Sequence, residues 1–367
     1  MRVLHVNAGN LYGGVETLLV TLARWRDLCP EMEPSFALSF QGQLSQELVE
    51  TGVPVYQLGE VRASRYWTIH RARRTLRRFL NDHRWDLVVT HMSWSHAVFG
   101  PEVRRARLPV VNWVHGISTG RSWVDRWAAR TPSDLMIYNS RFTQSVVSTQ
   151  FRDARNEVLY YPVTALAARA ADRDAIRREL GVASDTTVIL QVSRMEWWKG
   201  HRLHIDALAQ LKDLDGWVCW MAGGAQRREE REYLTDLQRR AAEAGIGDRL
   251  HFLGHRSDVP SLMAAADIFC QPNEGPEPFG IVFIEALQAG LPVVSTRMGG
   301  ACEIVDESCG VLVPPHDPGV LATHLRRFIK PAADRRLLAQ GGPRRAQALC
   351  DPRTQLARLF QVLAATA

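Results

Sequence analysis

Short apolar runs alternate with amphipathic stretches of helical length along almost the whole chain. In the first half, the runs cover residues 3–7, 35–40, 53–59, 87–92, 109–116 and 135–140. In the second half, they cover residues 186–193, 216–224, 250–255, 268–273, 292–296 and 310–314. Apolar runs separated in this way predict buried parallel strands that are joined by crossover helices. Two successive sets predict two doubly wound α/β domains.

The boundary between the two predicted domains is expected in residues 161–173. This segment follows the sequence YYPV and is rich in alanine and arginine. We therefore predict a first domain at residues 1–165 and a second domain at residues 166–350. The last helical stretch, residues 351–367, has no strand after it, so it can stay with the second domain or cross back to the first.

The bulk composition is that of a globular protein whose positive net charge suits anionic partners. The chain has 367 residues, of which 46% are hydrophobic and 23% are charged, and its net charge is +6. Its six cysteines form no C-x-x-C pair, which argues against a zinc site or a disulfide framework. No apolar run approaches the roughly 20 residues that a bilayer span needs. A strand begins at Val3 without a signal-peptide pattern, so we expect a cytoplasmic protein.

The segment EPFGIVFIE, residues 277–285, is the most informative stretch for function. It carries two carboxylates, Glu277 and Glu285, on either side of a glycine turn and the start of an apolar helix. The N-terminus of a helix offers unpaired N–H groups and a partial positive charge, which suit a diphosphate. A ligand with a central phosphate and hydroxyls at both ends would fit this spacing. The alternative is that the acids only interact favourably with the helix dipole.

The sequence SRMEWWKG, residues 193–200, places two cations in a strand-to-helix loop. Arg194 and Lys199 follow the first predicted strand of the second domain. Ligands bind at such loops because they lie at the carboxyl ends of parallel strands. Two cations there can neutralise a diphosphate leaving group. The alternative is solvated surface charge.

Three glycine-containing turns follow other predicted strands. The loop NLYGGVE, residues 10–16, contains Gly13 and Gly14, which permit close backbone approach at a helix start. It lacks the full G-x-G-x-x-G pattern, so a nicotinamide cofactor is not supported. His115 ends the strand-like run WVHG, and the pair Gly299-Gly300 follows the run at 292–296. A plain tight turn and a structural histidine are the alternatives.

In their order along the chain, these pieces resemble the retaining nucleotide-sugar glycosyltransferases of family 4, which have the GT-B fold. The resemblance covers nearly the whole chain and also includes FLGH at residues 252–255 and GG-x-x-E-I-V at residues 299–305. It implies two Rossmann-like domains facing a central cleft, with the acceptor side in the first domain and the donor site in the second. Two departures are YYPV in place of an asparagine-glycine turn and the extra glycine and proline of NEGPEPFG.

The resemblance also implies roles for individual residues. In that family, the residues that correspond to Arg194 and Lys199 hold the donor diphosphate. The residue that corresponds to Glu277 contacts the donor sugar, and the one that corresponds to His115 lies beside it. The catalytic candidates are Glu277, His115, Arg194 and Lys199. The donor-binding candidates are Gly13, Gly14, Gly254, His255, Phe279, Gly280, Ile281 and Glu285, with Glu285 on the ribose and Gly254 and His255 near the base.

We therefore predict a retaining glycosyltransferase of glycan biosynthesis that moves a sugar from a nucleoside-diphosphate donor to a hydroxyl acceptor. The acceptor is a glycan, a lipid-linked molecule or a small molecule. We expect no metal, because no Asp-x-Asp motif is present, and neither a cofactor nor a nucleic-acid partner. The alternatives are a GT-B-fold epimerase or phosphorylase, and a noncatalytic nucleotide-binding protein. The sequence does not fix the nucleotide, the sugar, the linkage or the oligomeric state.

One further stretch, residues 66–80, has the pattern of a basic amphipathic helix. Its apolar stripe consists of Ile69, Ala72, Leu76, Phe79 and Leu80. Its other positions carry arginines and a histidine without an acid among them. Such a helix can lie on an anionic membrane surface, which would make the protein peripheral at the inner membrane face. The alternative is that the stripe packs on the first sheet and the arginines are solvated.

Overall fold

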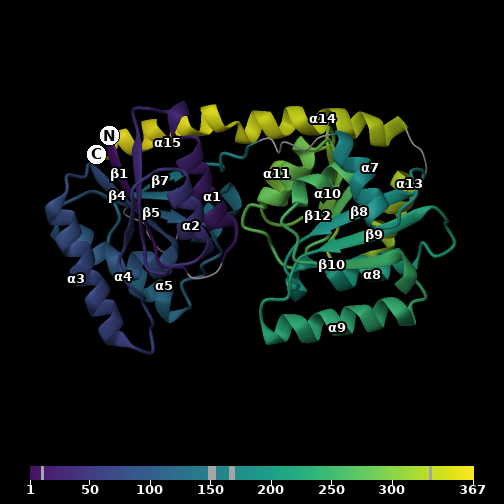
Figure 1. Ribbon diagram of the computed structural model, residues 1–367, viewed down its shortest axis with the longest axis horizontal. Coiled ribbons are helices and arrows are strands. Elements are labelled where there is room, and N and C mark those ends of the chain that lie inside the picture. Colours follow the sequence, from purple (N-terminus) through teal and green to yellow (C-terminus); the bar gives the residue numbers. More distant parts are fainter. Residues whose placement is uncertain (10–11, 148–153, 165–169, 330–332) are drawn as a thin grey trace. The chain divides into compact units, whose positions relative to one another are not determined.

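The computed structural model describes residues 1–9, 12–147, 154–164, 170–329 and 333–367. Their contacts divide the chain into two compact units (Figure 1). Unit 1 comprises Met1–Thr164 and Cys350–Ala367, and unit 2 comprises Ala165–Leu349. Part of the predicted linker, residues 165–169, lies outside the described residues. Within the described chain, no helix has both the length and the hydropathy that a bilayer span requires.

Unit 1 is built on a seven-stranded parallel sheet with the order β3-β2-β1-β4-β5-β6-β7. Its strands are β1 (Arg2–Asn7), β2 (Glu33–Leu38), β3 (Val55–Gln57), β4 (Leu87–His91), β5 (Val110–Val114), β6 (Leu135–Tyr138) and β7 (Arg155–Val158). The order reverses between β1 and β4, which is where ligands bind in open α/β sheets. Strands β1 to β6 confirm the apolar runs of the first half. Strand β7 was missed because its sequence, RNEV, is polar and lies at the sheet edge.

The helices of unit 1 fall into two groups by their contacts. Helices α3 (Tyr66–Asp82), α4 (Met92–Arg105) and α5 (Trp123–Ala128) contact one another in series. The other group consists of α1 (Gly14–Arg24), η1 (Arg26–Leu28), α2 (Gln43–Glu50) and α15 (Pro352–Ala364). Helix α6 (Arg141–Val147) packs on β6. The C-terminal helix therefore lies with unit 1, where it contacts η1.

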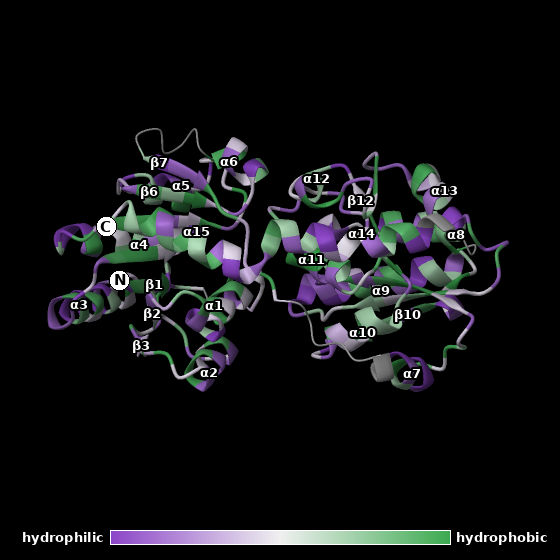
Figure 2. Cartoon of the chain, turned by 90° about the horizontal axis from the view of Figure 1, so that it is seen from above, coloured by the Kyte–Doolittle hydropathy of each residue, from purple (hydrophilic) through white to green (hydrophobic). Residues whose placement is uncertain are grey.

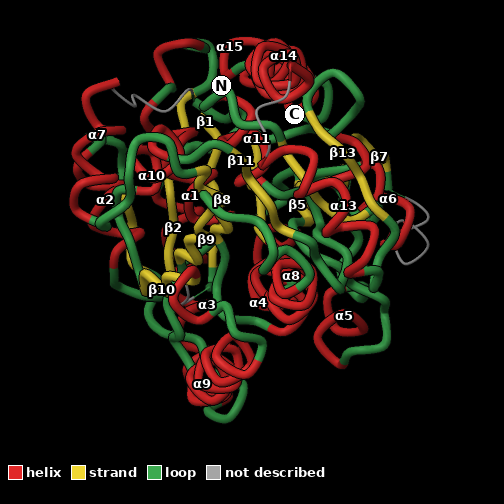
Figure 3. Tube along the Cα trace, turned by 90° about the vertical axis from the view of Figure 1, so that its right-hand side faces the viewer, coloured by secondary structure: helices red, strands yellow, loops and turns green. Residues whose placement is uncertain are grey.

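Unit 2 is built on a six-stranded parallel sheet with the order β10-β9-β8-β11-β12-β13 (Figure 3). Its strands are β8 (Thr187–Val192), β9 (Trp217–Ala222), β10 (Leu250–Gly254), β11 (Ile268–Gln271), β12 (Val293–Thr296) and β13 (Gly310–Val313). They confirm the apolar runs of the second half. The order reverses between β8 and β11, so the loops after these two strands meet at the ligand-binding edge of the sheet.

In unit 2, mutual contacts join three of the helices into one group. Helices α8 (His201–Ala209), α9 (Arg228–Glu243) and α13 (Pro318–Ile329) belong to one group. The remaining elements are α7 (Ala170–Glu179), η3 (Trp197–Lys199), η4 (Gly247–Arg249), α10 (Val259–Ala265), α11 (Ile281–Gln288), α12 (Ala301–Ile304) and α14 (Ala333–Cys350).

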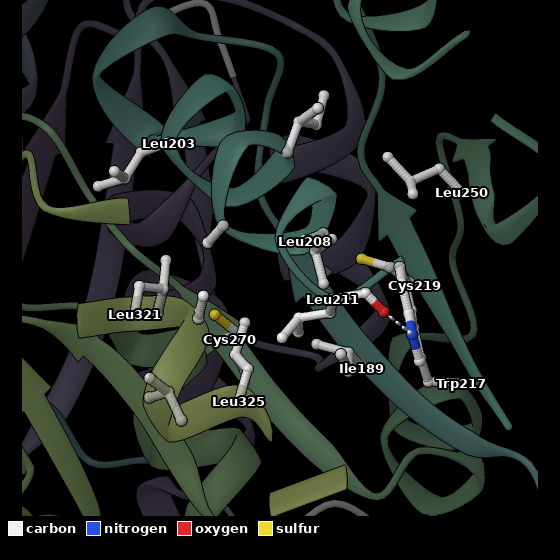
Figure 4. Packing of buried hydrophobic residues seen from close by; sticks show 14 of the residues in the cluster. Ile189, Leu203, Leu208, Leu211, Trp217, Cys219, Leu250, Cys270, Leu321 and Leu325 are labelled. Atoms are coloured by element: carbon white, nitrogen blue, oxygen red, sulfur yellow. Dashed lines mark hydrogen bonds between the residues drawn. The ribbon is translucent and has the colours of Figure 1, made fainter. Parts of the chain in front are cut away.

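A hydrophobic core in unit 2 packs against α8. Leu208, Leu211 and Trp217 pack together there, and the Trp217 indole donates a hydrogen bond of 3.2 Å to the Leu211 carbonyl (Figure 4). Truncating a fully buried leucine such as Leu208 would cost about 2–5 kcal/mol of unfolding free energy.

Candidate functional site

Two loops of unit 2 are joined at the point where the strand order reverses. Residues 193–200 follow β8, and residues 272–280 follow β11. The Trp198 carbonyl accepts hydrogen bonds from the N–H groups of Glu274 (2.8 Å) and Gly275 (3.1 Å). A Cβ on Gly275 would lie 2.9 Å from the Trp198 Cβ, which is too close. The extra glycine of NEGPEPFG, Gly275, is therefore required because a side chain at this position would collide with Trp198.

This junction brings Lys199 and Glu277 into direct contact. Lys199 Nζ lies 2.5 Å from Glu277 Oε2, and their side chains are 14% and 13% exposed. The ammonium also lies 3.9 Å from the centre of the Trp198 ring. Beneath it, the Gln191 side chain donates to the Lys199 carbonyl at 3.0 Å and is itself bonded to His204 at 2.8 Å. The cation is therefore fixed through both its side chain and its backbone.

Arg194 lies on the same loop but has different partners. Its guanidinium contacts Glu196 Oε1 at 2.7 Å and Glu230 Oε1 at 3.9 Å, and its side chain is 34% exposed. Glu230 is itself held in place, because its Oε2 accepts hydrogen bonds from the N–H groups of Gln226 and Arg227 at the start of α9. Arg194 is thus held by two carboxylates while part of its guanidinium faces solvent.

The acidic loop leads into helix α11 through a glycine in the left-handed region. Gly280 has φ +99°, and a Cβ on it would lie 2.4 Å from Phe283. Phe279 is buried, and the half-buried Ile281 begins the helix. The predicted order of loop, glycine turn and helix is confirmed. Helix α11 therefore begins shortly after Glu277 in the sequence, and the first N–H groups of a helix have no carbonyl partner one turn earlier in the helix.

The glycine pair after β12 supports this loop. The Gly300 N–H donates to the Glu277 carbonyl at 2.7 Å. A Cβ on Gly299 would lie 2.3 Å from the Glu277 carbonyl oxygen, and one on Gly300 would lie 2.5 Å from that of Phe279. In the structure these glycines let the neighbouring loop approach closely.

Glu285 lies about one turn inside α11 and is half-buried. Its carboxylate has no hydrogen-bond partner among the residues that the structure describes, and burial raises its pKa to about 7. A carboxylate in this state is available to accept hydroxyl groups of a ligand.

Gly254 and His255 lie at the same edge of the sheet, at the end of β10. Gly254 has φ +65°, and its carbonyl accepts the Gly223 N–H at 2.8 Å. His255 is exposed and packs beside Gly224. Both candidates for the base region therefore stand two strands away from Lys199 in the sheet order.

In unit 1, the glycine loop after β1 opens helix α1. Gly13 is the N-cap residue, Gly14 is the first helical residue, and both are exposed. Asn10 of the same motif lies outside the described residues. Glu16 is buried, which raises its pKa, and Oε1 accepts a hydrogen bond of 3.2 Å from the Asn7 amide.

His115 is buried and uses both ring nitrogens inside unit 1. Its Nε2 lies 2.8 Å from His91 Nδ1, and its Nδ1 lies 2.6 Å from the Tyr161 hydroxyl. His91 Nε2 lies 3.0 Å from His5 Nδ1. Burial lowers the pKa of His5 and of His115 to about 3, so both rings are neutral at pH 7.

Sequence reasoning selected His115 and placed His91 in the wall of the acceptor site, but it missed His5 and Tyr161. The available signal for His5 was only that it lies within the predicted strand at residues 3–7. Among the described residues, no group of three or more histidine, cysteine, aspartate or glutamate side chains is placed to hold a metal ion.

Comparison with known families matches both units. Residues 12–165 match the family model described as Glycosyltransferase Family 4, and residues 172–345 match that of Glycosyl transferases group 1. A GDP-mannose-dependent α-(1-6)-phosphatidylinositol monomannoside mannosyltransferase from Mycolicibacterium smegmatis is 30% identical over 78% of this chain and 78% of its own length. A D-inositol 3-phosphate glycosyltransferase from Salinispora tropica is 35% identical over 49% of this chain, but the match spans only 38% of that relative's length.

Solved structures resemble the whole chain. The Anabaena protein HepE, in complex with UDP and glucose, is 26% identical with a TM-score of 0.86, and the match covers 100% of both chains. The lipopolysaccharide glycosyltransferase WaaG is 19% identical with a TM-score of 0.73 over 98% of this chain and 99% of its own, a likeness of fold alone. The predicted GT-B fold with two Rossmann-like domains is confirmed.

Proposed function

The chain belongs to the family 4 type of glycosyltransferases, and we propose that it transfers a sugar, with retention of configuration, from a nucleoside-diphosphate donor to a hydroxyl acceptor. The observation that carries this proposal is the Lys199–Glu277 pair at the ligand-binding edge of the second sheet, directly before the N-terminus of α11. A UDP- and glucose-bound relative of the same fold supports it.

The proposed chemistry follows from the charges at this edge. Departure of the diphosphate concentrates negative charge on the leaving group, and Lys199, Arg194 and the N–H groups of α11 supply positive charge without a metal ion. Glu277 orients the donor sugar, and Glu285 accepts hydrogen bonds from the ribose hydroxyls. The acceptor hydroxyl attacks from the face that the leaving group vacates, which retains configuration.

Nucleotide binding is the first test. A ligand that binds only the folded state raises its stability, by about 2.7 kcal/mol at 100 times its Kd. We expect UDP or GDP to raise the Tm, because a relative holds UDP and another is named as GDP-mannose-dependent. Donor hydrolysis should then persist in EDTA. Binding without turnover across a broad acceptor panel would favour a noncatalytic protein, and activity restored by magnesium after EDTA would contradict the metal-free proposal.

Nucleotide affinity should rise with pH through the titration of Glu285. Its pKa is raised to about 7, so the carboxylate that accepts both ribose hydroxyls forms mainly above pH 7. We expect the UDP affinity of the wild type to increase between pH 6 and 8. The affinity for pyrophosphate, measured over the same range, corrects for the ionisation of the phosphate groups. Glu285→Gln should bind more weakly at pH 8 and lose this increase. An unchanged pH profile in this variant would contradict the ribose role.

The same titration affects stability in the opposite direction. Because burial raises the pKa of Glu285, the folded state binds more protons than the unfolded state between the ordinary pKa and about pH 7. The contribution of this group to stability therefore falls as the pH rises through that window. Without nucleotide, Glu285→Gln should remove this part of the pH dependence of unfolding.

We further propose that the protein is cytoplasmic and docks on an anionic membrane surface through α3. The apolar stripe of this helix packs into the core of unit 1, so docking would use its exposed rim. Figure 2 shows that α3 carries both hydrophilic and hydrophobic residues. Tyr66 and Trp67, 69% and 57% exposed, stand at its start, and Arg71 and Arg74 are exposed on the turns that follow. An aromatic pair beside arginines suits the headgroup region of anionic lipid.

Vesicle sedimentation tests this docking. We expect binding to phosphatidylglycerol vesicles at low salt, which fades as salt rises because the charges are screened. Replacing Arg71 and Arg74 by glutamate should abolish it, whereas the same change at the exposed Arg228 and Arg231 of α9 should not. A wild-type protein that stays in the supernatant with these vesicles would point to a soluble acceptor instead.

A further inference from the structure

We infer that His5, His91 and Tyr161 are positioning residues, which hold His115 and the turn at Gly116 in one arrangement for sugar transfer. The inference rests on the proposed function, because the resemblance places the match to His115 beside the donor sugar. It changes the role of His115 itself. With both ring nitrogens bonded inside unit 1, this side chain acts by holding the turn and is not free to take a proton from the acceptor.

His5, His91, His115 and Tyr161 form a row that crosses neighbouring strands of the sheet in unit 1. His5 lies on β1, His91 ends β4, and His115 follows β5 directly. The centres of adjacent imidazole rings are 5.2 and 5.1 Å apart, with ring planes at 29° and 12°. Asn139, which follows β6, donates from Nδ2 to the Tyr161 hydroxyl and to the His115 carbonyl, both at 3.1 Å. Side chain and backbone of His115 are thus tied to the same group of residues, all of them buried.

The turns next to the row are tightly packed. Met92 follows His91 with φ +69°, a left-handed conformation that a residue with a Cβ adopts only under constraint. A Cβ on Gly116 would lie 3.3 Å from Met92 Cε. The bond between His91 and His115 therefore joins two loops that already touch, and a change in the row would move both.

The hydrogen bonds of the row must all run in one direction. A neutral imidazole has one donor and one acceptor nitrogen, so fixing the proton on one ring fixes it on the next. The Tyr161 phenol is a stronger acid than an imidazole N–H, so it donates to His115 Nδ1. His115 then donates from Nε2 to His91, and His91 donates from Nε2 to His5.

The surroundings of His5, at the far end of the row, argue against proton conduction along the row. His5 Nε2 is buried and has no hydrogen-bond partner among the described residues. A proton that entered at Tyr161 would therefore have no acceptor at the other end. The arrangement therefore fixes the tautomer and the ring orientation of His115, here called the lock, and it does not carry protons to solvent.

Variants at both ends of the row test the lock. Tyr161→Phe removes the hydroxyl with little change in volume, and His5→Leu removes the other end. His5→Asn keeps a donor and an acceptor near the Nδ1 position. The control is His96→Gln, since His96 is a buried histidine of unit 1 outside the row, bonded to Thr90 Oγ1 at 2.9 Å and to the Thr131 carbonyl at 3.0 Å.

Imidazole nitrogen NMR provides a readout that does not need activity. We expect wild-type His115 to be a neutral Nε2–H tautomer from pH 6 to 8, and Tyr161→Phe and His5→Leu to shift its signals while His96→Gln leaves them unchanged. Donor turnover should fall about tenfold or more in the two row variants, which is the effect of one lost buried hydrogen bond on a barrier. UDP-induced stabilisation should be unchanged, and His5→Asn should restore most of the turnover.

Two other results would overturn the inference. Row variants with wild-type turnover and wild-type His115 signals would show that the row positions nothing. An equal loss of turnover in His96→Gln would show that any buried histidine of unit 1 has this effect. Absence of both UDP binding and donor turnover in the wild type would instead overturn the proposed function, while the spectra would still report whether the row fixes the tautomer of His115.

Discussion

Lys199→Ala is expected to slow sugar transfer by about 100-fold or more. The ammonium of Lys199 is held in place by Glu277, by the Trp198 ring and through its own backbone, so it needs little reorganisation when charge develops on the leaving group. Removing one preorganised group of this kind typically lowers the rate by about 10²–10³-fold. The measurement is kcat for donor hydrolysis, which needs no known acceptor, together with UDP affinity.

The matched control for this variant is Lys212→Ala, because Lys212 is an exposed lysine away from the site loops and should leave kcat unchanged. Arg194→Ala should also lower the rate, since Arg194 is held on the same loop by Glu196 and Glu230. Lys199→Arg should recover only part of the activity, because a planar guanidinium does not replace a compact ammonium beside Trp198. A Lys199→Ala enzyme with a normal rate would remove Lys199 from the catalytic candidates.

The fold was largely predictable because burial leaves a clear signal in the sequence. Strands that are covered on both faces read as continuous apolar runs, as in residues 187–192, and they were identified. Strand β7 was missed because edge strands need no such run, and the segment Arg155–Val158 is polar. The contact between Lys199 and Glu277 was not predicted, although general rules make it understandable. Both lie in loops after strands, and the reversal of strand order puts those loops side by side.

The histidine row could not be predicted, because it depends on the order of the strands and on side-chain rotamers. His5 and His91 are 86 residues apart, and only the pairing of β1 with β4 makes them neighbours. The need for glycine at 275 has the same origin. It becomes evident only when the Trp198 side chain is placed against it. Long-range contacts between polar residues carry no periodic pattern, whereas apolar burial does.

Glu277→Gln is expected to strengthen UDP binding and to slow turnover. In the free protein Glu277 neutralises Lys199 at 2.5 Å, so the incoming diphosphate competes with this carboxylate for the cation. Without the negative charge, UDP should bind a few-fold more tightly. The free protein should lose about 1.5–3 kcal/mol of unfolding free energy, the value of a charged hydrogen bond, and UDP should restore it. Turnover should still fall about 100-fold, because the donor sugar loses the group that orients it.

The matched control is Glu274→Gln, since Glu274 lies on the same loop but faces His316 at 3.6 Å and not Lys199. It should change neither UDP affinity nor kcat by more than about twofold, because a partly exposed ion pair contributes little free energy. Calorimetric titration with UDP and kcat for donor hydrolysis, measured on the same preparations, give both quantities. If Glu277→Gln weakened UDP binding and left kcat unchanged, the carboxylate would serve the nucleotide rather than the sugar. The separate roles of Glu277 and Glu285 would then have to be exchanged.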